Sequence, residues 1–180
     1  MFKKFKELIK KEFNDIEIMK IDPKDIVFEE RVKLKCFYCN KYNKKWTCPP
    51  KLPSLDYKTI VKSEYPNAIV LKCTMSITIE NFEVVRFKTT NIIHLCLGKL
   101  EKLLYDNNDS LAVSFIGGSC KLCKNDCNPH GCANPKQARI PLEAIGVNVV
   151  ETMKRQNLNI TFPIKSTLSR YGLLLWGSKS

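Results

Sequence analysis

The segment AIVLKCTMSI, residues 68–77, is apolar and rich in residues that favour strands, and Pro66 and Asn67 precede it. Such a run is typical of a strand that is buried within a sheet. A helix is expected over residues 88–106, where isoleucine, leucine and cysteine side chains recur at helical spacing. The next apolar segment, SLAVSFI at 110–116, predicts another buried strand that leads directly into a cysteine-rich loop.

Further elements are expected on both sides of this central part. They are an amphipathic helix at 2–13, a strand at 16–21, a helix from Ser54 to about Glu64, a helix at 141–156 starting at Pro141, and strands at 159–163 and 171–176. Because helices and strands alternate, we expect an α/β or α+β fold. Residues 1–180 should form a single domain, with a central sheet flanked by helices and two cysteine loops at 36–50 and 117–135.

The composition is strongly basic, with a net charge of +12 and a pI of about 9.3. Nucleic acid, an acidic protein or an anionic cofactor could each explain this charge. The lysines are scattered, however, and no arginine-rich run or RNA-binding aromatic signature accompanies them. We therefore expect a generally basic surface, with nucleic-acid binding the less favoured explanation.

The apolar runs are short, and none approaches the roughly 20 residues that a membrane-spanning helix needs. The N-terminal sequence MFKKFKELIKKEF interrupts its apolar residues with lysines and therefore does not resemble a secretory signal. A cytoplasmic protein without a membrane segment is the expectation. In a reducing compartment, dense cysteine favours metal or redox chemistry over structural disulfides.

Seven of the nine cysteines fall into two groups that each begin with C-x-x-C. The first group, in CFYCNKYNKKWTCPP, is Cys36, Cys39 and Cys48; the second, in GGSCKLCKNDCNPHGCANP, is Cys120, Cys123, Cys127 and Cys132. Zinc could be held by the C-x-x-C pairs of the two groups. An iron–sulfur cluster fits better, because C-x₂-C-x₃-C-x₄-C is close to the ferredoxin spacing C-x₂-C-x₂-C-x₃-C-P.

The ligand count leaves one position open, because seven thiolates are one short of two four-thiolate clusters. Cys73, Cys96 or His130 could supply the eighth ligand, or an iron could remain open for a substrate. Cys73 and Cys96 are also explained as ordinary buried cysteines. A filled position would favour electron transfer, whereas an open iron would favour catalysis.

The whole pattern resembles the predicted metal-binding family catalogued as domain of unknown function 2284. The resemblance rests on CFYCNKYNKKWTCPP, on the loop and helix GGSCKLCKNDCNPHGCANPKQARIPLEAIGVNVVETM, and on YGLLLW near the end of the chain. It implies that the seven grouped cysteines are ligands of an iron–sulfur or other metal centre, of a kind typical of anaerobes. It implies no particular reaction. Ala133 departs from the basic residue expected after the last cysteine.

These observations lead to three functional hypotheses. The favoured one is an iron–sulfur protein with one or two [4Fe–4S] clusters that acts in electron transfer, as a redox subunit or oxidoreductase with a redox protein partner. The second is an enzyme whose open iron binds a small-molecule substrate. The third is a zinc-stabilised module that binds nucleic acid or protein. Glu143 is either an acid–base residue or a helix-start carboxylate, and Arg139 either an anion ligand or an ion-pair partner.

Overall fold

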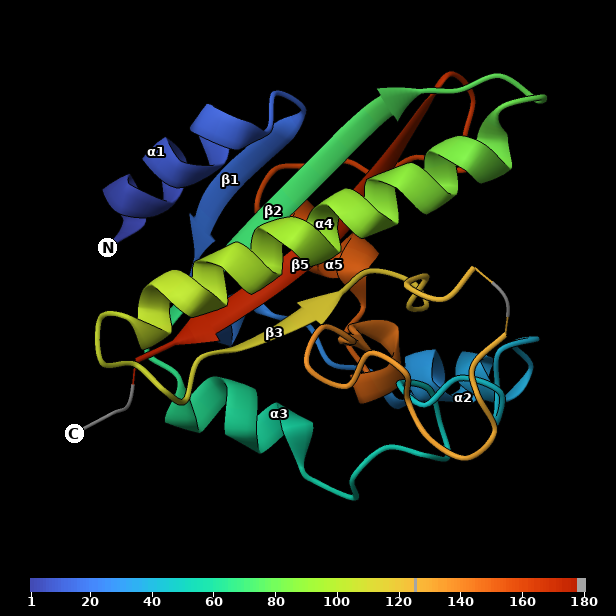
Figure 1. Ribbon diagram of the computed structural model, residues 1–180, viewed down its shortest axis with the longest axis horizontal. Coiled ribbons are helices and arrows are strands. Elements are labelled where there is room, and N and C mark those ends of the chain that lie inside the picture. The colour runs from blue at the N-terminus through green and yellow to red at the C-terminus, as the bar shows by residue number, and fades with distance from the viewer. Residues whose placement is uncertain (125, 178–180) are drawn as a thin grey trace.

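Five strands form one mixed sheet in the order β1-β2-β5-β3-β4 in the computed structural model, which describes residues 1–124 and 126–177 (Figure 1). The strands are β1 (Ile16–Ile21), β2 (Asn67–Ser76), β3 (Val113–Ile116), β4 (Ile140–Pro141) and β5 (Thr167–Trp176). Only the β3–β4 pair is parallel; the other pairs are antiparallel. The expected fold class is thus confirmed as α+β.

The sheet is built around β2 and β5, which pair along their full length from Asn67 opposite Trp176 to Ser76 opposite Thr167. Side chains of β2 alternate between the two faces of the sheet, so that Ile69 and Leu71 join one buried cluster and Ala68 and Val70 join the other. This two-sided burial explains why the sequence of β2 is apolar without alternation.

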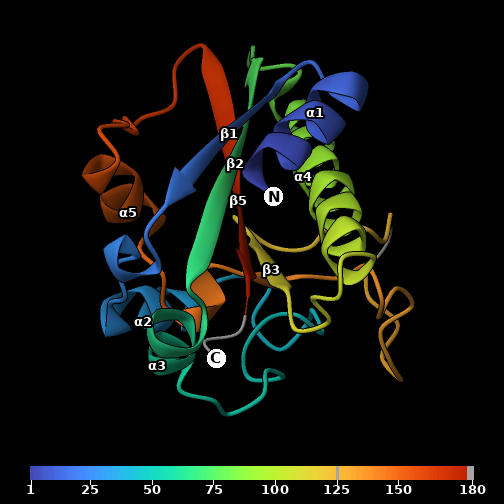
Figure 2. The ribbon, with the colours of Figure 1, turned by 90° about the vertical axis from the view of Figure 1, so that its left-hand side faces the viewer.

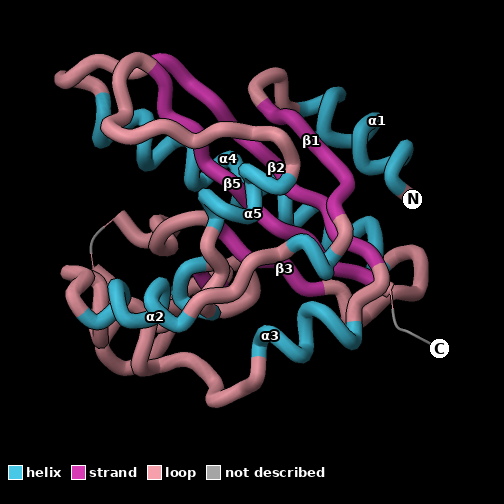
Figure 3. Tube along the Cα trace, turned by 180° about the vertical axis from the view of Figure 1, so that it is seen from behind, coloured by secondary structure: helices cyan, strands magenta, loops and turns pink. Residues whose placement is uncertain are grey.

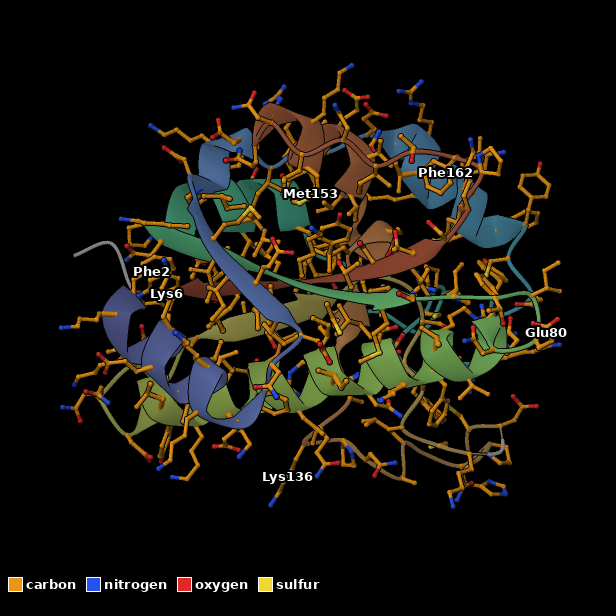
Figure 4. All side chains as sticks on the ribbon, turned by 90° about the horizontal axis from the view of Figure 1, so that it is seen from above. Phe2, Lys6, Glu80, Lys136, Met153 and Phe162 are labelled. Carbon is orange, nitrogen blue, oxygen red and sulfur yellow. The ribbon has the colours of Figure 1, made fainter. Side chains whose placement is uncertain are left out.

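Helices cover both faces of the sheet, giving three layers (Figure 2). The helices are α1 (Phe2–Glu12), α2 (Glu30–Phe37), α3 (Tyr57–Thr59), α4 (Phe82–Tyr105) and α5 (Val149–Arg155), with short helical turns η1 (Pro23–Asp25), η2 (Ile60–Glu64) and η3 (Glu143–Ile145). Helices α1 and α4 share one face, and Met153 of α5 lies on the opposite face (Figure 4). No helix in the described part of the chain combines the length and apolarity needed to cross a membrane.

Several sequence-based elements are confirmed, including the helix at 2–13 and the strands at 16–21, 68–77 and 171–176. The helix expected at 88–106 begins earlier, at Phe82. The strand expected at 110–116 is shorter, because it begins at Val113. The helix expected from Ser54 begins at Tyr57, because Asp56 rather than Ser54 caps it by accepting a hydrogen bond from the Thr59 N–H group.

Two predicted elements are wrong. The helix predicted at 141–156 is divided, because Pro141 ends β4 and Gly146 adopts a left-handed φ of 93° that stops η3. Only Val149–Arg155 is α-helical. The strand predicted at 159–163 is instead an irregular connection between α5 and β5, seen across the sheet in Figure 3.

Gly172 permits the close approach of α4 to β5. A Cβ atom at this position would lie 2.6 Å from Ile93 Cγ2 and 3.1 Å from Leu97 Cδ1. The preceding residue, Tyr171, accepts a hydrogen bond from the Gly117 N–H group through its carbonyl oxygen. The same short stretch of β5 therefore sets the position of α4 and the starting point of the second cysteine loop.

We predict that Gly172→Ala lowers the free energy of unfolding by about 1–3 kcal/mol, because the methyl group overpacks the α4–β5 contact. Chemical denaturation measures the change. Gly98→Ala is the matched control, since Gly98 lies on α4 and an added Cβ atom there would meet no neighbouring group within 4 Å; it should be neutral or slightly stabilising. Equal stability of Gly172→Ala and the wild type would contradict the proposed close packing.

Candidate metal centre

The two cysteine groups lie close to α2 (Figure 1, lower right). Cys36 is in the last turn of α2, so the first loop starts later than the expected residue 36, while the other six grouped cysteines lie in the loops that follow α2 and β3. The first loop begins at the end of α2, where the Cys39 N–H group donates to the Cys36 carbonyl oxygen, and it turns again where the Cys48 N–H group donates to the Lys45 carbonyl oxygen. The second loop follows β3 and begins at Gly117. The fold therefore brings together two segments that are far apart in the sequence.

Direct contacts join the two loops. The Trp46 indole Nε1–H group donates to the Asn128 carbonyl oxygen at 2.7 Å. Lys45 is buried, and its Nζ atom lies 3.9 Å from Asp126 Oδ1. Trp46 also has a neighbour from its own segment, since Lys51 Nζ lies over its ring at 4.4 Å from the centroid. Trp46 is thus the main link between the loops, a role that the sequence did not reveal.

Cys48 and Cys120 mark the junction of the two loops. Both are buried, whereas Cys39 is exposed and the other four grouped cysteines are half-buried. The charges of Cys36, Cys39 and Cys120 all act on the Cys48 thiol, while those of Cys127, Cys123 and Cys132 act on Cys120. Cys120 of the second loop is therefore close enough to act electrostatically on Cys48 of the first loop.

Burial keeps the inner thiols protonated when no metal is present. It raises the pKa of Cys48 to about 11, and it also raises the pKa values of Cys36 and Cys120 above the ordinary thiol range. A nucleophilic cysteine needs a lowered pKa, so these thiols lack the character of catalytic nucleophiles. A bound metal deprotonates coordinating thiols outright, which makes ligation the chemistry that suits them.

Glu143 ties the start of η3 to both loops. Its carboxylate accepts a hydrogen bond from the Gly118 N–H group at 3.0 Å, just before the second cysteine group. After burial, its negative charge is the next cause that raises the pKa of Cys36. Glu143 therefore does more than begin a helix, because it stands between the two cysteine groups.

Asn134 contacts a thiol of the second group, whereas the His130 side chain is exposed. The Asn134 Nδ2–H group donates to Cys123 Sγ at 3.4 Å. His130 is exposed, and its backbone N–H group donates to Asn128 Oδ1. Across residues 1–124 and 126–177, no three or more histidine, cysteine, aspartate or glutamate side chains converge closely enough to hold a single metal ion.

Cys73 and Cys96 lie in the hydrophobic core between the sheet and helices α1 and α4. Both are fully buried, and burial raises their pKa values to about 11 and about 12. The charge of Cys73 acts on Cys96, whereas neither residue is among the causes that shift the pKa of Cys48 or Cys120. Cys73 and Cys96 share this buried cluster with Cys120, so the core that holds the pair reaches the start of the second cysteine loop.

Arg139 and His94 have structural partners. The Arg139 guanidinium forms a largely buried ion pair with Glu101 and also donates to Ser114 Oγ. His94 Nδ1 lies 3.2 Å from the Thr90 carbonyl oxygen within α4, and burial lowers the His94 pKa to about 4. Arg139 is thus an ion-pair partner, as one of the two sequence-based interpretations proposed.

The free thiols of the two adjacent cysteine groups are the donor type that metal sites use, although no three of them converge on one ion position in the described part of the chain. The chain belongs to the family of predicted metal-binding proteins DUF2284, which matches residues 19–176. This range contains all nine cysteines, so the family resemblance seen in the sequence is confirmed. No curated protein and no solved structure matches the chain.

We predict that Trp46→Phe weakens the junction between the loops, because the ring is kept while the N–H donor to Asn128 is lost. Such a bond is worth about 0.5–1.5 kcal/mol, so metal should leave the loaded protein several times faster in the presence of a chelator. Tyr38→Phe is the control, since Tyr38 is an exposed aromatic residue of the same loop. Release from Trp46→Phe at the wild-type rate would show that the contact does not secure the centre.

Proposed function

We propose that this is an iron–sulfur protein whose two loops bind one or two [4Fe–4S] clusters and which acts in electron transfer. The observation that carries the proposal is the packing of the loops, with buried Cys48 and Cys120 at their junction. The ligands would be the seven grouped cysteines, namely Cys36, Cys39, Cys48, Cys120, Cys123, Cys127 and Cys132. A bound cluster would supply reversible one-electron redox chemistry.

Residues around the thiols suit this role. The hydrogen bond from Asn134 to Cys123 Sγ would stabilise a reduced cluster, because donors to ligand sulfur raise the reduction potential. Buried Lys45 lowers the pKa of Cys48 against the effect of burial, so its positive charge favours the thiolate. Trp46 is half-buried and bonded to the second loop, and in this proposal its ring would shield the junction from water.

The positions of Cys73, Cys96 and His130 show how well each could supply the eighth ligand. Cys73 and Cys96 are packed in the core, and His130 is exposed, with its backbone N–H group bonded to Asn128. Cys120 acts electrostatically on Cys48 and is acted on by the cysteines of its own loop, so we propose that it completes a set of four with one of the two groups. With seven thiolates, one of two clusters would keep one iron without a cysteine ligand.

A redox protein is the proposed partner, and an exposed apolar surface supports it. Leu34, Phe37 and Tyr38 are 61%, 59% and 76% exposed beside Cys36 and Cys39. Phe37 and Tyr38 stack edge to face with ring centroids 5.3 Å apart. Exposed aromatic and aliphatic side chains are common at protein interfaces, and here they border half-buried Cys36 and exposed Cys39.

A second candidate function is catalysis at an iron without a cysteine ligand. It is favoured by a hollow of about 370 Å³ lined by Cys36, Cys39 and Glu143, together with Arg31 and Lys35. A small substrate in this hollow would lie next to the three-cysteine group. Mössbauer spectra that distinguish one iron, and that change when citrate is added, would favour this enzyme over a simple electron carrier.

The two classes of cysteine can be separated by matched substitutions. We predict that Cys123→Ser removes much of the bound iron and lowers the melting temperature, because a ligand and a hydrogen-bonded sulfur are lost together. Cys73→Ser is the control; it should keep the wild-type iron content while losing about 1–3 kcal/mol of stability from the buried hydroxyl group. Wild-type iron content in Cys123→Ser, or iron loss in folded Cys73→Ser, would contradict the ligand assignment.

The proposed function is tested by reductive titration of anaerobically purified protein. Stoichiometric uptake of one electron per cluster, with the appearance of an electron paramagnetic resonance signal and reversal on reoxidation, is expected. A colourless protein that contains zinc and accepts no electrons would overturn the iron–sulfur proposal. Salt-dependent RNA binding by such a protein would then favour the zinc-stabilised nucleic-acid-binding module.

A further inference from the structure

A basic cavity lies between the first two turns of α4 and parts of both cysteine loops. Its volume is about 780 Å³, within the range of small-molecule sites. Five cationic side chains line it, namely Lys41, Lys45, Arg86, Lys121 and Lys124. Cys120 and Cys123 line the same cavity, so a ligand there would lie against the second cysteine group.

The positive charge of the cavity is not balanced by its acidic residues. Only two carboxylates of the described residues line it, and they are already engaged: Glu83 with Arg86 and Asp126 with Lys45. Lys121 donates to the carbonyl and hydroxyl oxygens of Ser119. Among the described residues, neither Lys121 nor Lys41 has a carboxylate within ion-pair distance, so both can face an incoming anion.

A further cation, Arg170, lies near the cavity without lining it. The Arg170 guanidinium lies under Gly118, where it would be 3.8 Å from an added Cβ atom. Its Nε atom is buried and has no hydrogen-bond partner in the described structure. Arg86 and Arg170 both act electrostatically on Lys121, while the Glu143 carboxylate also acts on Arg170. Concentrated, partly desolvated cations of this kind favour an anion more strongly than scattered surface lysines do.

Another part of the cavity wall is apolar. Val84 and Phe87 on α4 line it and are 68% and 40% exposed. Neither side chain belongs to the two hydrophobic clusters on the faces of the sheet. The cavity therefore combines a cationic wall with an apolar, partly aromatic wall, a pairing that inorganic anions alone would not use.

We propose that this cavity binds a small organic anion. Its aromatic or apolar part packs against Val84 and Phe87, and its phosphate or carboxylate group faces Lys41, Arg86 and Lys121. This site is distinct from the hollow beside Cys36 and Cys39. The proposal that an organic anion binds here depends only on the cavity. Any electron exchange between that ligand and the second cysteine loop rests on the proposed iron–sulfur function.

Isothermal titration calorimetry on the purified full chain tests the proposal with four probes. Phenyl phosphate and phenylacetate carry both features, inorganic phosphate carries only the charge, and benzyl alcohol carries only the ring. We expect at least one aromatic anion to bind more tightly than inorganic phosphate and benzyl alcohol. The tighter of the two aromatic anions identifies the anionic group as phosphate or carboxylate.

Substitutions then assign the binding to the cavity. Arg86 and Lys41 lie on different segments. Arg86→Gln and Lys41→Gln should each lower the affinity for the aromatic anion about tenfold, because a charged hydrogen bond is lost. Phe87→Ser should lower the affinity for phenyl phosphate without changing the affinity for inorganic phosphate. Lys88→Gln is the control, since Lys88 is exposed on the same helix and does not line the cavity.

The proposal is overturned if the wild type binds neither aromatic anion, or if both Arg86→Gln and Lys41→Gln bind as the wild type does. Binding of an acidic protein through these residues, without binding of the small probes, would also overturn it and mark a protein-docking surface instead. Binding of phenyl phosphate by a chain that contains zinc and no iron would support the anion site while rejecting the iron–sulfur function. The two proposals therefore fail separately.

Discussion

The candidate centre depends on the packing of one cysteine loop against the other. Trp46 and Asn128 are 82 residues apart in the sequence, yet the indole N–H group reaches the Asn128 carbonyl oxygen. The core fixes where the second loop begins: Gly117 is bonded to β5, and Glu143 of η3 is bonded to Gly118. Without these attachments the seven grouped thiols would belong to two unrelated loops.

The chemistry of the thiols follows from that packing. Burial at the junction raises the pKa values of Cys48 and Cys120, so these residues are neutral thiols unless a metal replaces their protons. Metal binding and proton release should therefore be coupled. The surrounding lysines and arginines have two uses, since some stand beside the thiols and others, such as Lys41 and Arg86, face a cavity.

The sequence predicted the parts of the structure that local pattern controls. The apolar run of β2, the amphipathic spacing of α1 and the two C-x-x-C groups all led to correct elements or to the confirmed family. The predicted helix from Pro141 was wrong because proline suits the first turn of a helix and also the end of an edge strand. Nothing local revealed that Gly146 would adopt a positive φ there.

The contacts that shape the site could not be predicted, because they join distant segments. The partner of Trp46 is a backbone carbonyl group, which carries no sequence signature. The basic cavity likewise combines Lys41, Arg86 and Lys121 from three separate segments. Conversely, the interpretation of Cys73 and Cys96 as ordinary buried residues could be made from their positions in an apolar strand and helix, and their place in the core agrees with it.

The central claim, that the joined loops hold iron–sulfur clusters, is tested most directly by counting metal in protein purified under strict anaerobiosis. The measurement is iron, zinc and acid-labile sulfide per chain on the same sample. We expect about four or about eight irons, with an equal amount of sulfide, for one or two [4Fe–4S] clusters. Zinc without iron or sulfide would contradict the claim.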